Sequence, residues 1–203
     1  MTEFAQEIEI LDRQTVYRGY FQIDRYRLRH RKFDGGWTDP FIREVFERGH
    51  AVGVLLYDPN RDVVVLIEQF RIGAAAAGRP AWLIEVVAGM IGPGESDAEV
   101  ARRETLEEAG CVITDLIRIC DFLVSPGGTS ERIALFCGRV ASDTAGGIHG
   151  LADEHEDIQV RAMATDDAIA LLDANVIDNA TTIIALGWLA RNRAALRQRW
   201  LGP

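Results

Sequence analysis

Residues 89–111 read GMIGPGESDAEVARRETLEEAGC and contain the clearest structural signal in the chain. Ser96 followed three positions later by Glu99 is a capping box, which marks the beginning of a helix. Gly110 closes the acidic run and is the residue type that most often ends a helix. The segment therefore predicts a helix over residues 97–109.

At about 100° per residue, this helix has two different sides. Beside a narrow stripe of small residues, Glu104 and Glu108 lie one turn apart, and Arg103 can pair with Glu107. Stacked carboxylates repel each other, so we expect a compensating cation, and an all-oxygen ligand set favours Mg²⁺. An acid-rich helix alone is more often a solvated surface, so the surrounding sequence has to decide. The small residues of the stripe are Ala98, Ala101, Thr105 and Ala109.

Upstream of the helix, alternating and continuous apolar runs predict strands. Residues 7–31 alternate apolar and polar positions around Arg18-Gly19 and predict an antiparallel hairpin, followed by a turn-rich link over 33–41. Single strands are predicted over residues 51–58, 63–70, 82–88 (ending at Gly89) and, downstream, 132–140.

The C-terminal third predicts a polar loop and two helices. The loop spans residues 142–157, and Thr165 is the expected N-cap of a helix over 165–173. The last helix is expected to begin near Asp178. The order of elements predicts an α/β fold with a mixed sheet. We expect a small N-terminal β element over residues 1–47 and a main domain over 48–203.

Composition excludes several classes of function. The net charge of −9 and the pI near 5.0 argue against a nucleic-acid partner. No apolar run approaches the roughly 18 residues that cross a bilayer, and the start MTEFAQEIEI lacks the pattern of a signal peptide. Three scattered cysteines predict packed, reduced thiols and a cytoplasmic location; they are Cys111, Cys120 and Cys137.

The 89–111 segment resembles the signature box of the Nudix hydrolases. It departs from the box only at two aliphatic positions, occupied by Thr105 and Cys111, which leaves the carboxylates intact. The resemblance implies a Nudix-type α/β/α sandwich and metal-assisted hydrolysis of a diphosphate. The matching fixed positions are Gly89, Glu95, Arg103, Glu104, Glu107, Glu108 and Gly110.

Further segments resemble the bacterial ADP-ribose pyrophosphatase subfamily over practically the whole chain. Pro126 lies about fifteen residues past the box, where that subfamily carries a proline. The other matching segments are EQFR at 68–71, EVVAGMI at 85–91, SPGGTSER at 125–132 and GIHGLADEHEDI at 147–158. The implied reaction is hydrolysis of ADP-ribose to AMP and ribose 5-phosphate.

The resemblance also implies a role for individual residues. The metal, Mg²⁺ or Mn²⁺, would be held by the Ala88 carbonyl, Glu104, Glu108 and Glu156. Catalysis would involve Glu154 as the base for the attacking water, together with Glu107 and Arg103. Substrate would contact Arg71, Glu131, Met90, Tyr20 and Arg43. Tyr20 and Arg43 would come from the partner chain of a homodimer that exchanges its N-terminal strands.

The residues themselves support these roles unequally. Arg71 ends an apolar strand and so overlooks a cleft, although without the resemblance a surface ion pair is the commoner role. The acidic stretch 153–157 fits either a catalytic loop or a solvated turn. Nothing in the sequence supports Tyr20 or Arg43 independently. His50 and His149 receive no catalytic role, because such histidines are more often structural.

Two alternative functions stay open at this level. The same chemistry could act on another nucleoside diphosphate sugar, such as GDP-mannose, or on NADH. A non-catalytic ADP-ribose sensor belongs to a different class, but such a module is expected to lose the box glutamates or to carry a basic appendage. All the box carboxylates are present here and no basic appendage is seen.

Overall fold

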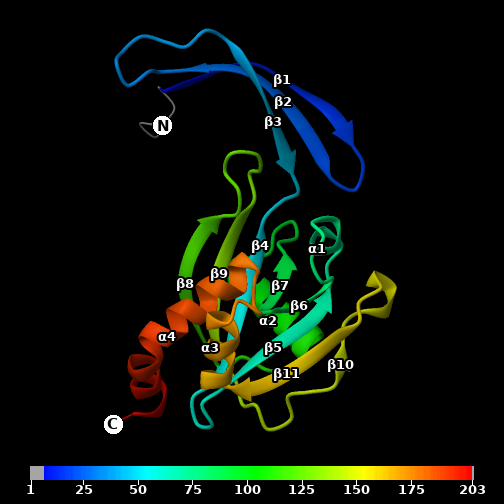
Figure 1. Ribbon diagram of the computed structural model, residues 1–203, viewed down its shortest axis with the longest axis vertical. Helices are drawn as coiled ribbons and strands as arrows, with labels where there is room; N and C mark the ends of the chain where they lie inside the picture. The colour runs from blue at the N-terminus through cyan, green and yellow to red at the C-terminus, as the bar shows by residue number, and fades with distance from the viewer. Residues whose placement is uncertain (1–6, 203) are drawn as a thin grey trace. The chain divides into compact units, whose positions relative to one another are not determined.

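The computed structural model describes residues 7–202, apart from the side chain of Glu154. These residues form two compact units, one made of the chain up to Gly49 with residues 123–132, the other of residues 50–122 and 133 onward. Each unit has its own sheet (Figure 1). No helix among the described residues is both long and apolar enough to cross a bilayer.

The first unit is a three-stranded antiparallel sheet in the order β1-β2-β3. Its strands are β1 (Ile8–Arg18), β2 (Gln22–His30) and β3 (Phe41–Glu47). The hairpin and the link after it are confirmed, whereas β3 was not predicted. Residues 123–132 join this unit through β3, because the Phe46 N–H donates to the Gly128 carbonyl at 2.8 Å.

The second unit is a mixed eight-stranded sheet with helices on both faces. The main path runs β10-β11-β5-β4-β9-β8, with β6 beside β5 and β7 beside β4; β4 and β9 are parallel. The strands are β4 (Ala51–Asp58), β5 (Val63–Phe70), β6 (Trp82–Glu85), β7 (Val87–Met90), β8 (Asp115–Leu123), β9 (Arg132–Arg139), β10 (Ile148–His149) and β11 (Ile158–Ala164). The helices are α1 (Ile72–Ala76), α2 (Asp97–Ala109), α3 (Thr165–Asp173) and α4 (Ala180–Leu201), with the 3₁₀ turn η2 (Ala152–Glu154).

Successive side chains of the central strand β4 point to opposite faces of the sheet, and helices cover both faces. Val54 and Leu56 point into the core under α2, whereas Leu55 and Tyr57 point into the core under α3 and α4. A strand covered on both faces reads as a continuous apolar run, as the 51–58 segment does. In Figure 1, α3 and α4 cover one face of the sheet and α2 lies behind it. The predicted α/β/α sandwich is therefore confirmed.

Several predicted boundaries are wrong in detail. The single strand over 82–88 is two strands, because β6 pairs with β5 and β7 pairs with β4. Thr165 is the first residue of α3, not its N-cap, since its hydroxyl donates to the Asp62 carbonyl at 2.9 Å. The last helix begins at Ala180, with the Asn179 side chain accepting from Thr182 N–H. Strands β8, β10 and β11 and helix α1 were not predicted.

Candidate active site

Helix α2 has the predicted bounds and the predicted caps. The Ser96 side chain accepts from the Glu99 N–H, and the Glu99 carboxylate accepts from the Ser96 N–H at 2.8 Å. Gly110 ends the helix in the left-handed conformation, at φ 62°. Both ends are thus fixed by contacts within the segment itself, which explains why the sequence was sufficient to place them.

The small-residue stripe of α2 packs against the sheet over three of its four predicted residues, whereas Ala98, in the first turn, is exposed. Ala101, Thr105 and Ala109 are almost completely buried, and β7 and β4 are the strands that α2 approaches most closely. Thr105 occupies an aliphatic position of the box, but its hydroxyl donates to the Ala101 carbonyl at 2.7 Å. Its polar atom is satisfied within the helix, so the substitution leaves the packing intact.

Arg103 is the centre of a carboxylate network on α2. Its guanidinium donates to Glu107 at 3.1 Å, the pair that the spacing predicts, and also to Glu104 at 2.7 Å and Glu95 at 3.0 Å. The hydrogen bond from Arg103 lowers the pKa of the Glu95 carboxyl, and the carboxylates raise the pKa of Arg103. A planar guanidinium with five donors can hold three carboxylates at once, which an ammonium group does less well.

Glu104 and Glu108 are the two acids on the sheet side of the helix. Glu108 is only 3% exposed, and one of its oxygens accepts from the Ala88 N–H at 3.0 Å. Burial raises the pKa of Glu108 to about 8, with the charges of Glu104 and Glu156 acting in the same direction. Burial raises the pKa of Glu104 as well. Buried, mutually repelling carboxyl groups are the environment that a bound cation would stabilise.

Gly89 explains why the backbone of β7 can approach these acids so closely. A Cβ atom built on Gly89 would lie 1.8 Å from a Glu104 carboxylate oxygen. Any side chain at this position would displace the carboxylate. The glycine at the start of the box is therefore required by the close approach of β7 to α2.

The loop over 142–157 is more ordered than a plain loop. It contains β10, which pairs with β11, and the 3₁₀ turn η2. Glu156 is half-buried and accepts from the Leu151 N–H at 3.0 Å, and its charge raises the pKa of both Glu104 and Glu108. Glu154 ends η2, and its side chain lies outside the part of the chain that the structure describes.

The chemistry of this donor set fits a hard divalent cation. Carboxylate oxygens and a backbone carbonyl are the ligands that Mg²⁺ and Mn²⁺ accept. Among the described residues, however, no three acidic, histidine or cysteine side chains form a ready-made metal group. Glu104 is bonded to Arg103 and Glu156 to Leu151. Each of these bonds uses one carboxylate oxygen, so the second oxygen of Glu104 and of Glu156 can still bind a metal.

Two further predicted residues lie in the second unit. Arg71 follows β5 and donates to Glu85 at 2.9 Å, so the ion pair considered from the sequence is present. Burial raises the pKa of Glu108, and the positive charge of Arg71 acts in the opposite direction. Met90 ends β7 with its side chain partly exposed, and its carbonyl accepts from Arg103 at 3.5 Å.

Tyr20, Arg43 and Glu131 belong to the first unit. Tyr20 lies in the turn between β1 and β2 and is 95% exposed. It is therefore not a core residue, although an aromatic residue in a strand usually is. Arg43 lies on β3 with its guanidinium 4.6 Å from the ring centroid of Phe41. Glu131 is buried and pairs with Arg48 at 3.5 Å.

Sequence reasoning gave no role to two acids that hold the arginines in place. Glu95 binds Arg103, and the mostly buried Glu85 binds Arg71. Glu95 could have been found, because it is a fixed position of the box. Glu85 had no comparable signal, since its pairing depends on β6 lying beside β5.

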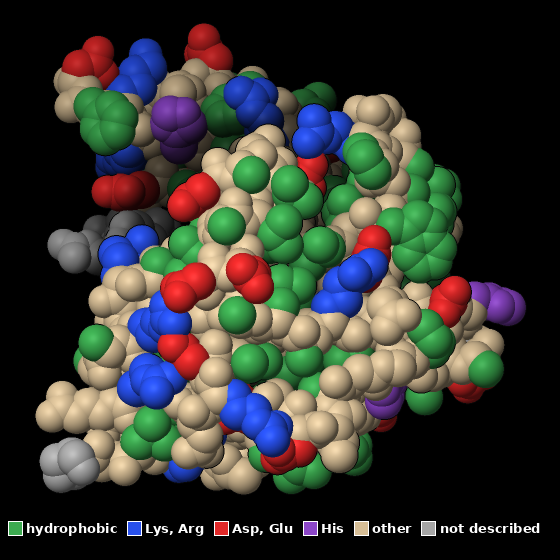
Figure 2. Space-filling model, turned by 60° about the horizontal axis from the view of Figure 1, so that its bottom comes forward, with side chains coloured by type: hydrophobic (Ala, Val, Ile, Leu, Met, Phe, Trp, Pro, Cys, Tyr) green, Lys and Arg blue, Asp and Glu red, His purple; other side chains and the backbone are tan. Residues whose placement is uncertain are grey.

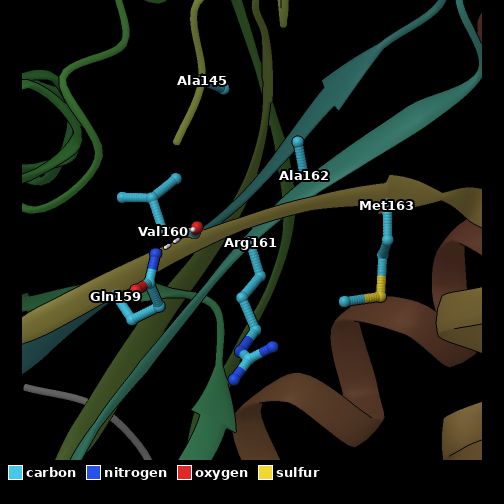
Figure 3. Close-up of a pocket in the computed structure, with 6 residues that line it drawn as sticks. All are labelled: Ala145, Gln159, Val160, Arg161, Ala162 and Met163. Carbon is cyan, nitrogen blue, oxygen red and sulfur yellow. Dashed lines mark hydrogen bonds between the residues drawn. The ribbon is translucent and has the colours of Figure 1, made fainter. Parts of the chain in front are cut away.

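A cavity of about 550 Å³ lies elsewhere, along the outer edge of β11. Figure 3 shows Gln159, whose side-chain amide donates to the Val160 carbonyl, with Arg161 and then Met163 further along β11. None of the predicted site residues lines this cavity. The candidate active site at α2, β7 and Glu156 is therefore separate from this cavity, although Ala145 of the 142–157 loop lines it.

Comparison with known proteins shows the family of the chain. The family model described as NUDIX domain matches residues 47–185, and the chain belongs to the Nudix family. It is 50% identical over 194 residues to the ADP-ribose pyrophosphatase of Escherichia coli (strain K12), covering 96% of this chain and 93% of that one. The ADP-ribose pyrophosphatase of Haemophilus influenzae is 44% identical, with 96% and 91% covered.

A solved structure titled "Crystal structure of ADP compounds hydrolase" shares the fold. The two chains superpose with a TM-score of 0.73, covering 95% of this chain and 97% of that one, at 22% identity. At this identity the likeness supports the fold alone.

Proposed function

We propose that this protein hydrolyses the diphosphate of ADP-ribose. Water adds its oxygen to one phosphorus, the bridging P–O bond breaks, and the products are AMP and ribose 5-phosphate. The observation that carries the proposal is the buried Glu108, which accepts from the β7 backbone, beside the half-buried Glu104, which Arg103 holds. Relatives at 50% and 44% identity over nearly the whole chain bear the name of this activity.

The metal is proposed to be Mg²⁺, with Mn²⁺ as the alternative. The Ala88 carbonyl, Glu104, Glu108 and Glu156 would hold it. When bound, the ion supplies positive charge that screens the diphosphate and makes a water more acidic. The raised pKa values of Glu104 and Glu108 support this assignment, because burial disfavours the charged form of both groups and a bound cation would offset that cost.

The chain's own residues then orient the substrate and move the proton. Arg103 fixes the Glu104 and Glu107 carboxylates, so that their positions are set before substrate arrives. Arg71 binds a phosphate oxygen, and Glu85 keeps its guanidinium oriented. We assign Glu154 as the general base that takes a proton from the attacking water. Met90 contributes a substrate contact from the end of β7.

The first unit is proposed to mediate a homodimer that exchanges its N-terminal strands. Its sheet exposes apolar side chains that a partner could cover, among them Ile8 at 54%, Ile10 at 59% and Tyr17 at 59%. Tyr20 and Arg43 of the partner chain would enclose the adenine, and Glu131 would bind the terminal ribose hydroxyls. In this proposal residues 1–47 are the dimerisation element and residues 48–203 the hydrolase domain.

The proposal includes no nucleic-acid or membrane partner and places the protein in the cytoplasm. Figure 2 shows a face on which Lys and Arg side chains lie beside Asp and Glu, not in one continuous basic area. Ion pairs such as Arg161–Glu68 and Arg193–Asp62 also place basic side chains next to acidic ones in the second unit. Three free cysteines, two of them buried, fit a reducing compartment.

A substrate panel tests the proposal directly. Purified protein is incubated with ADP-ribose, GDP-mannose and NADH, with Mg²⁺, with Mn²⁺ and with chelator, and nucleoside monophosphate release is measured. We expect AMP from ADP-ribose to have the highest kcat/KM and chelator to abolish it. Faster GMP release from GDP-mannose would make GDP-mannose the preferred substrate. Equal rates with and without chelator would show that hydrolysis needs no metal. Binding of ADP-ribose without any hydrolysis would favour a sensor.

A further inference from the structure

His149 lies against the end of the helix that carries the carboxylates. A Cβ atom built on Gly110 would be 2.6 Å from the Cε1 atom of the His149 ring. Gly110 also has a φ of 62°, the left-handed region that favours glycine. The residue that ends α2 therefore has two separate reasons to be glycine, and one of them is the space that the imidazole occupies.

Two hydrogen bonds join this ring and its neighbour to the surrounding backbone. The Nε2 atom of His149 lies 2.9 Å from the Gly146 carbonyl, and because a carbonyl only accepts, Nε2 carries the proton. The Gly150 N–H donates to the Glu107 carbonyl in the last turn of α2, at 3.4 Å. The Gly150 hydrogen bond and the packing of the His149 ring on Gly110 thus hold the 142–157 loop against α2, whereas the His149 hydrogen bond lies within the loop itself.

Gly150 and Leu151, which follow His149, also contact Glu156. Gly150 has a φ of 99°, and a Cβ atom there would lie 2.7 Å from the Cβ of Glu156. The Leu151 N–H donates to the Glu156 carboxylate at 3.0 Å, and the Glu156 N–H donates to the Leu151 carbonyl at 3.2 Å. Movement of the loop at His149 and Gly150 would therefore displace Glu156 as well.

We infer that His149 is a positioning residue, whose ring holds the 142–157 loop on the C-terminal end of α2 and so sets where Glu156 stands relative to Glu104 and Glu108. The inference rests on the proposed function only in assigning those carboxylates a catalytic use. The imidazole does not touch substrate. The ring packs against Gly110 and donates a hydrogen bond from Nε2. A glutamine side chain can place an N–H donor at a similar distance and so replaces part of this function, whereas alanine replaces none.

The first experiment compares His149→Ala and His149→Gln with the wild type. In His149→Ala we expect faster amide hydrogen exchange over residues 148–157, measured without metal or substrate, and kcat for ADP-ribose lowered about 10- to 100-fold, as for lost outer-shell partners. KM should change little, since the phosphate and ribose contacts lie elsewhere. His149→Gln should recover most of the exchange protection and of kcat. His155→Asn, a change at an exposed histidine of the same loop, is the matched control.

The second experiment tests the contact with Gly110. Gly110→Ala should loosen the loop in the wild type, because the new methyl group meets the ring. In the His149→Ala background the same change should cost less, since only the backbone strain remains. Strictly additive effects on the loop's amide exchange would contradict the contact. If His149→Ala folds poorly, Gly110→Ala and His149→Gln are each compared with the wild type instead, and amide exchange of the loop unchanged in both would contradict the contact.

The outcomes separate this inference from the proposed function. Unchanged exchange and unchanged kcat in His149→Ala would overturn the positioning role. A lower melting temperature with unchanged kcat and KM would overturn it too, because the ring would then be a packing residue only. If the wild type does not hydrolyse ADP-ribose, the proposed function fails, while the exchange measurements and the Gly110 comparison still decide whether His149 holds the loop.

Discussion

Helix α2 and the 142–157 loop both bring acidic side chains to the proposed site, but they are held in different ways. The helix is fixed by its own capping box, its left-handed Gly110 and a buried stripe. The loop is fixed by hydrogen bonds to distant backbone and by glycines that allow close contacts. The carboxylates of α2 are thus positioned by one short segment of sequence, whereas those of the loop are positioned by contacts with segments distant in sequence.

The largest effect is expected at Glu108, the α2 residue proposed to bind the metal. Glu108→Gln removes a proposed ligand and should lower kcat about 1000-fold or more, since a metal Lewis acid supplies several kcal/mol of transition-state stabilisation. In chelator the variant should be at least as thermostable as the wild type, because a neutral amide avoids the desolvation of the buried carboxylate. Kinetics and thermal melts check both parts. Glu99→Gln, which keeps the cap, is the control on the same helix, and near-normal activity of Glu108→Gln would remove α2 from the mechanism.

The corresponding test of the loop is Glu154→Gln. A lost general base should lower kcat about 100-fold with little change in KM, the lower end of the range for such groups. Steady-state kinetics with ADP-ribose measures the two constants separately. Asp153→Asn, at the exposed neighbouring position, should have little effect. A rise in KM alone would make Glu154 a binding residue and leave the base to be found elsewhere.

Elements that local contacts fix could be predicted from sequence, whereas those that depend on distant segments could not. The bounds of α2 were correct to the residue, because its caps and its packing stripe are all local. The bounds of β4 and β5 were also correct, since two-sided burial gives continuous apolar runs. The split between β6 and β7 was missed because it depends on which strand each one pairs with.

In the site, local spacing was again sufficient only for local contacts. It predicted the Arg103–Glu107 pair one turn apart on α2, which the structure contains. It did not predict Glu85 beside Arg71 or His149 beside Gly110, since both contacts join segments that are distant in sequence. The roles of Tyr20, Arg43 and Glu131 came from resemblance alone and stay predictions.

Arg103→Lys tests whether the acidic side chains around Arg103 need one residue that donates several hydrogen bonds at once. Lysine keeps the charge but cannot hold Glu95, Glu104 and Glu107 together, so kcat should fall about 10-fold or more, as for other lost outer-shell contacts. Arg102→Lys, one residue earlier, changes a contact with the Ile113 carbonyl and should leave kcat unchanged. Full activity of Arg103→Lys would show that charge alone orders the carboxylates.

Asp58→Asn probes how the loop is anchored. The Asp58 carboxylate accepts from the N–H and hydroxyl of Ser142, where the loop begins, and these bonds outweigh burial and lower its pKa. A lowered folded-state pKa gives stability that is present above the unfolded value near 3.8 and is lost as pH falls below it. The variant should lose about 1–3 kcal/mol at pH 7. Between pH 4 and 2 its melting temperature should fall less steeply than that of the wild type, and an equally steep fall would assign the acid sensitivity to other groups.

Ser96→Ala should have the smallest effect, because the helix frame has several independent supports. Losing the cap leaves the Glu99 N–H without its side-chain acceptor and should cost about 1 kcal/mol in urea unfolding. The buried stripe and the Arg103 network remain, so kcat should stay near the wild-type value. Ser142→Ala is the matched change in the loop, since it removes one of the hydrogen bonds that hold its start. If Ser96→Ala lowered kcat more than Ser142→Ala, the carboxylate frame would depend on the first turn of α2, and the helix would be no more self-sufficient than the loop.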